Sequence, residues 1–97
     1  MSDLYFEAMQ EQWQNIRALY MTCKNKRPII LYDIQENKIF AYPYKEFKAE
    51  LSERSQALLE HDYKSASARR SMVVFVRDNA KQKLVSYIMS IDGVNIQ

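Results

Sequence analysis

The sequence has very little glycine, cysteine or histidine. Its 97 residues include one Gly, two Pro, one Cys and one His. A phosphate-binding loop needs several glycines so that the backbone can approach the ligand closely, and Gly93 stands alone. P-loop, dinucleotide-binding and nucleophile-elbow motifs are therefore excluded. A structural zinc site takes four Cys or His ligands, and this chain has only Cys23 and His61. We therefore expect neither a bound metal nor a cofactor.

The same scarcity bears on the cellular setting. Cys23 is the only cysteine and cannot form a disulfide within the chain, which favours a reducing, cytoplasmic environment. Asp3 and Glu7 occupy the region where a secretory signal would carry basic and then apolar residues. The longest uncharged, apolar-rich stretch, residues 84–91, is far shorter than the 18 or so residues of a membrane span. We therefore expect no association with a membrane.

What remains has the composition of one globular domain. Hydrophobic residues make up 47% of the chain and charged residues 27%, with a net charge of +2. A chain of this length folds around one core rather than two. We therefore expect a single domain over residues 1–97.

Apolar residues near the N-terminus recur at alternating spacings of three and four. The members of this series are Phe6, Met9, Trp13, Ile16, Tyr20 and Cys23. Such a period predicts one amphipathic helix that begins after Ser2 or Asp3. Pro28 cannot continue it.

The rest of the chain predicts four strands and a second helix. The β-rich runs are 29–34, 39–42, 72–76 and 84–91, and the helix spans 44–63 with Phe47, Leu51, Leu58 and Leu59 as its buried stripe. Val94 and Ile96 either add a very short edge strand or fray. Polar turns inside each pair of strands favour antiparallel hairpins. The order α-β-β-α-β-β predicts an α+β fold: a single antiparallel sheet of about four strands packed with two helices.

Both faces of this sheet are apolar, which a sheet with one solvated face would not show. In 72–76, Met72, Val74 and Val76 point to one side while Val73 and Phe75 point to the other. One explanation places the helices on opposite faces. The other places both helices on one face and leaves the second to another chain, most simply a second copy in a homodimer.

We therefore expect a small protein-interaction or regulatory module without catalytic machinery that associates with itself or with another protein. Aromatic side chains dominate the energy of protein interfaces. The strand aromatics Tyr32, Phe40, Tyr42, Phe75 and Tyr87 are the candidate contact residues.

An alternative function is nucleic-acid binding. Basic residues precede the first and third strands and border the last turn, as Lys24, Lys26, Arg27, Arg69, Arg70, Lys81 and Lys83. If these loops converge, their cations would contact phosphates and the strand aromatics would stack on bases.

A second alternative is a small enzyme with a carboxylate and histidine site. His61 lies between Glu60 and Asp62 near a helix end, where a histidine also simply stabilises the helix. Asp33 is a charge on an otherwise apolar strand, which indicates either an edge-strand charge that deters aggregation or a polar anchor in a pocket. Cys23 fits best as an inert, partly buried thiol.

Overall fold

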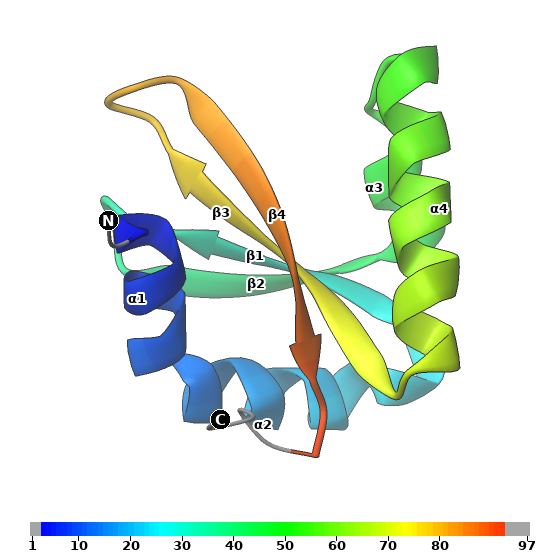
Figure 1. The fold of residues 1–97 in the computed structure, drawn as a ribbon, viewed down its shortest axis with the longest axis horizontal. Coiled ribbons are helices and arrows are strands. Elements are labelled where there is room, and N and C mark those ends of the chain that lie inside the picture. Colours follow the sequence, from blue (N-terminus) through cyan, green and yellow to red (C-terminus); the bar gives the residue numbers. More distant parts are fainter. Residues whose placement is uncertain (1–2, 93–97) are drawn as a thin grey trace.

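Four strands form one open sheet in the computed structural model, which describes residues 3–92 (Figure 1). The strands are β1 (Pro28–Asp33), β2 (Lys38–Pro43), β3 (Ser71–Asp78) and β4 (Lys83–Ser90). Their order is β2-β1-β3-β4. The pairs β1–β2 and β3–β4 are antiparallel hairpins, but β1 and β3 run parallel with Ile30 opposite Val74. The α+β class is confirmed, and the prediction of a purely antiparallel sheet is wrong because the sheet is mixed.

The parallel pair has a simple cause. Short turns join the strands within each hairpin and force them to run antiparallel. The segment between the hairpins contains helices, which carry the chain back along the sheet. β3 therefore starts at the same end of the sheet as β1.

Each of the two predicted helices is divided in two. The first becomes α1 (Leu4–Glu11) and α2 (Trp13–Cys23), with a bend at Gln12, and a short 3-10 helix, η1 (Lys24–Lys26), follows. Both segments pack against the sheet through a buried residue, Met9 in α1 and Ile16 in α2. α1 lies beside β4 and α2 lies across β1 and β2, so the bend lets both follow a twisted surface that a straight helix would leave.

The second helix breaks after residue 49. α3 (Tyr44–Ala49) ends there and α4 (Glu53–Ala68) begins after Ser52. The Ser52 side chain accepts a hydrogen bond from the Ser55 backbone N–H at 3.3 Å, as an N-cap does. α4 then continues through residues that follow the predicted helix end at Tyr63.

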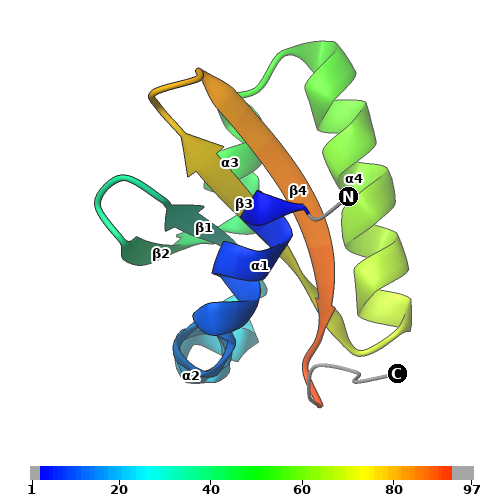
Figure 2. The ribbon, with the colours of Figure 1, turned by 60° about the vertical axis from the view of Figure 1, so that its left-hand side comes forward.

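The helices lie on opposite faces of the sheet (Figure 2). α1 and α2 cover the face that carries Ile30 and Val74, and α3 and α4 cover the face that carries Ile29 and Val73. The inner strands β1 and β3 thus contribute side chains to two separate cores. This arrangement accounts for their being apolar on both sides.

A buried ion pair joins the two hairpins at the carboxyl ends of β1 and β3. Asp33 is fully buried and accepts two hydrogen bonds from the Arg77 guanidinium, from Nη2 at 2.9 Å and from Nε at 3.1 Å. Asp33 also accepts the backbone N–H of Glu36 at 3.1 Å. Asp33 therefore does not sit on an edge strand as one interpretation expected: it lies on the inner strand β1, and its charge is matched by Arg77.

A second carboxylate extends this connection. Asp78 accepts hydrogen bonds from the Tyr5 hydroxyl and the Gln35 amide, both at 2.6 Å. Gln35 in turn accepts the Asn79 backbone N–H at 2.8 Å. The turns of both hairpins and α1 are thereby linked through polar side chains.

Replacing Asp33 should destabilise the protein strongly. In Asp33→Ala the guanidinium of Arg77 loses its partner. Because that side chain is 38% exposed, water compensates in part, and we expect a loss of about 3 kcal/mol, at the low end for a broken buried pair. Urea denaturation measures it, with Asp62→Ala on α4, which replaces a half-exposed aspartate, as the control. A loss below about 1 kcal/mol would contradict this role.

The same groups predict acid sensitivity. The hydrogen bond from the Glu36 N–H and the Arg77 charge hold the pKa of Asp33 below its ordinary value, although burial opposes them. The Tyr5 hydroxyl and the Gln35 amide likewise lower the pKa of Asp78. The unfolded chain then binds more protons than the folded one as the pH falls. We expect the free energy of unfolding to decline below about pH 5, less steeply in Asp33→Asn than in the wild type.

Candidate functional site

The outer edge of β4, residues 83–90, has no strand beside it within residues 3–92. From Leu84 to Ser90 this strand contains no charge, no proline and no glycine. An open edge presents unpaired backbone N–H and C=O groups that can pair with another strand. β4 therefore has the properties of a pairing site.

The opposite edge, β2, is protected. Lys38 begins this strand and Pro43, which lacks an N–H, ends it. Charges and prolines at strand edges discourage pairing between chains. The two edges of the sheet are thus unlike.

Exposed apolar side chains border β4 on both faces. Leu84 and Ile88 on the strand are 48% and 39% exposed, Leu58 on α4 is 62% exposed, and Phe6 on α1 is 38% exposed. Phe6 lies in a hollow with Ile88, and Leu58 lies in a hollow with Leu84. The prediction that Leu58 belongs to a buried stripe is wrong, because α4 lies over β3 and faces the sheet through Leu59 instead.

The hollow between α4 and β4 has a volume of about 330 Å³ and is called the α4–β4 groove below. Its walls are Leu51, Ser55, Leu58, Leu59, Asp62, Phe75, Leu84 and Ser86. A second hollow of about 220 Å³ shares Leu51 and Leu84 with it and reaches Tyr42 and Phe47. The helices on this face thus leave the β4 side of the sheet uncovered.

The five strand aromatics divide between the two faces. Phe40, Tyr42 and Phe75 lie on the α3/α4 face, where Phe47 joins them: its ring centroid is 6.1 Å from that of Tyr42 and 5.0 Å from that of Phe75. Tyr32 is buried in the core beneath α1 and α2, and its hydroxyl donates to Asn37 at 2.9 Å.

Tyr87 on β4 is held by the N-terminus. Its hydroxyl donates to Asp3 at 2.8 Å and its ring lies 5.7 Å from that of Phe6. Burial and this hydrogen bond raise the pKa of Tyr87 to about 12. Tyr87 therefore connects β4 to α1.

The seven candidate cations are divided between the two ends of the sheet. Lys24, Lys26, Arg27, Arg69 and Arg70 precede the starts of the parallel strands β1 and β3, whereas Lys81 and Lys83 lie at the β3–β4 turn. A strand of eight residues separates the groups by about 26 Å. One compact ligand cannot contact both.

Other candidate residues lie apart from any cluster. The His61 side chain is 83% exposed, with Nδ1 3.6 Å from Asp62, and Cys23 is half-buried at the end of α2. Within residues 3–92, no three acidic, His or Cys side chains come together as ligands for a metal ion. No helix in that range is long and apolar enough to cross a membrane.

The neighbours Leu58 and Leu59 should respond oppositely to truncation. Leu59 is 2% exposed, so Leu59→Ala should cost about 3 kcal/mol of folding stability. Leu58→Ala should stay within about 0.5 kcal/mol because its side chain is already in water. Denaturant titration at low protein concentration compares them, and equal losses would contradict the placement of Leu58.

The chain was also compared with known proteins. No protein-family model matches it, and neither does a curated protein or a solved structure. A function is therefore inferred from the geometry of the described residues.

Proposed function

We propose that this protein is an interaction module that associates with a second copy of itself through β4. The observation that carries the proposal is the open edge of β4, which is uncharged from Leu84 to Ser90 and bordered by exposed apolar side chains. Two such edges can pair antiparallel around a two-fold axis and form one sheet that continues across both copies.

The sequence of β4 is complementary to itself in one register. Side chains directly opposite each other in an antiparallel pair share a face. With Ser86 on the axis, Leu84 of each copy lies opposite Ile88 of the other. The two most exposed apolar residues of the strand then cover each other.

The surroundings of β4 support the same register. Leu58 lines the α4–β4 groove together with Leu84 and Ser86, so an Ile88 from the second copy, opposite Leu84, comes within reach of it. Covering a half-exposed Leu or Ile contributes on the order of 1 kcal/mol, and each contact occurs twice in a symmetric pair. Backbone hydrogen bonds along the strands add direction and register.

Placing a charge on the axis tests the proposal. The wild type should show a mass near twice 11.6 kDa by size exclusion with light scattering. Ser86→Lys sets two like charges opposite each other and should give the monomer mass, while its exposed position leaves the fold intact, as circular dichroism would show.

Two variants control for this change. Ala57→Lys adds the same charge on an exposed position of α4, and Ser86→Thr keeps the axis neutral with a residue that strands favour. Both should remain dimeric. A monomeric wild type at several hundred micromolar, or a Ser86→Lys variant that is still dimeric, would refute association through β4.

A further inference from the structure

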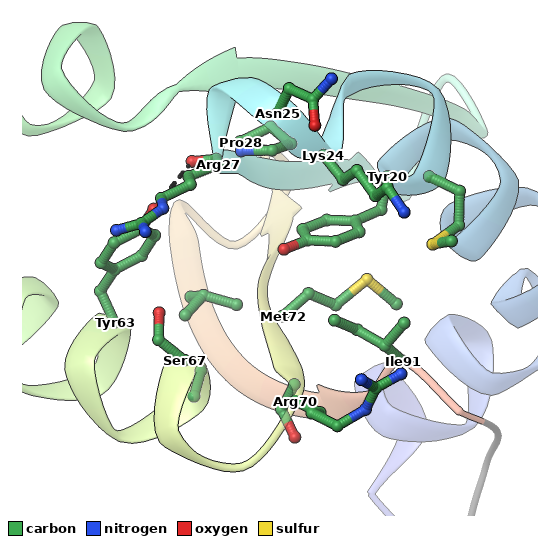
Figure 3. A pocket seen from close by; sticks show the side chains of 14 residues that line it. Tyr20, Lys24, Asn25, Arg27, Pro28, Tyr63, Ser67, Arg70, Met72 and Ile91 are labelled. Carbon is green, nitrogen blue, oxygen red and sulfur yellow. Dashed lines mark hydrogen bonds between the residues drawn. The ribbon is translucent and has the colours of Figure 1, made fainter.

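A separate cavity lies where β1 and β3 begin, beside the ends of α2 and α4 (Figure 3). It has a volume of about 360 Å³, within the range of small-molecule sites. Apolar side chains, among them Met72 and Ile91, line one part of it, and the Tyr20 hydroxyl points into it. It lies at the far end of β3 from the Asp33–Arg77 pair.

The lining of this cavity is cationic. Lys24, Arg27 and Arg70 contribute to it, and no acidic residue does. Arg70 makes a two-pronged ion pair with Asp92, with N–O distances of 3.0 and 3.1 Å. Among residues 3–92, no carboxylate lies within ion-pair distance of Lys24 or Arg27. Within the part of the chain that the structure describes, two positive charges at the cavity therefore have no acidic partner.

The position of Arg27 adds to this pattern. Its φ of 49° and ψ of 61° lie in the left-handed region, where a residue with a Cβ costs roughly 1 kcal/mol and glycine is usual after a helix. The Tyr63 hydroxyl donates to the Arg27 carbonyl at 3.2 Å, a contact that glycine would also make. The fold therefore needs the backbone of residue 27 but not its side chain.

The positive charge of Arg27 also acts on two tyrosines that line the cavity, Tyr20 and Tyr63. Burial raises the pKa of both Tyr20 and Tyr63, and the positive charge of Arg27 partly offsets the rise for each. Arg27 thus lies close enough to influence both phenols. The Tyr20 hydroxyl points into the cavity, with the Arg27 side chain beside Tyr63 on one side and the Lys24 side chain on the other (Figure 3).

We propose that this cavity binds a small phosphate monoester with a flat apolar body, of the size of a mononucleotide. A phosphate monoester carries a charge of about −1.5 to −2 at pH 7. This charge matches Lys24 and Arg27 together, whose long side chains would turn toward the phosphate from opposite sides of the cavity. The hydroxyls of Tyr20 and Ser67 add hydrogen-bond donors. The apolar lining and the Tyr20 ring accommodate the body of the ligand.

Calorimetric titration of the full chain with AMP tests the site, with adenosine and inorganic phosphate as partial ligands. AMP should bind at least tenfold more tightly than either part alone. Arg27→Gly and Lys24→Gln should each weaken AMP binding about tenfold. Lys81→Gln, which removes the same charge at the other end of the sheet, should leave binding unchanged.

The stability of Arg27→Gly separates a binding role from a structural one. Glycine relieves the left-handed backbone, so this variant should melt at or above the wild-type temperature while losing AMP. Ser86→Lys should bind AMP like the wild type, which keeps the result independent of association through β4.

Three outcomes would overturn the proposal: no AMP binding at millimolar concentration, undiminished binding in Arg27→Gly, or equal weakening in Lys81→Gln. A single-stranded oligonucleotide that binds far more tightly than AMP, with affinity falling steeply between 50 and 200 mM salt, would likewise overturn it in favour of a nucleic-acid surface.

Discussion

The parallel contact between β1 and β3 is the interaction on which the rest of the structure depends. An isolated two-stranded hairpin is at best marginally stable in water, and the chain contains two. When the two hairpins lie side by side, the inner strands β1 and β3 contribute to both cores. Ile30 and Val74 pack against one helix layer, and Ile29 and Val73 pack against the other. The buried pair of Asp33 and Arg77 fixes the register at one end. Without this contact each helix layer would face half a sheet.

The sequence predicts the elements of this fold better than their assembly. β-rich apolar runs and polar turns mark all four strands, because both signals are local to each hairpin. The pairing of β1 with β3 is not local. It depends on the end of the sheet to which the helices between the hairpins return the chain, and the strand residues do not specify that end. The break at Gln12 likewise follows from the twist of the surface beneath α1 and α2, while the break before α4 has a local signal in Ser52, which caps the helix.

The surfaces were harder to predict for a related reason. Periodicity predicts which residues of a helix share a face, but not how far the sheet beneath the helix extends. The sequence therefore predicts burial for both Leu58 and Leu59, although only Leu59 is buried. The cations read as one group in the sequence, although the sheet separates Lys81 and Lys83 from the rest. Conversely, Arg27 and Arg70 are distant in the sequence and line one cavity only because two parallel strands begin there.

The difference between the two edges of the sheet limits how large an assembly can grow. A sheet covered by helices on both faces can be extended only sideways, and endless extension requires two receptive edges. Here the β2 edge carries Lys38 and Pro43, which discourage strand pairing. Two chains that pair through β4 would therefore leave no edge that readily pairs with a third chain. If the chain associates through β4 as proposed, growth by strand pairing would therefore close at two copies and would not lead to a fibre.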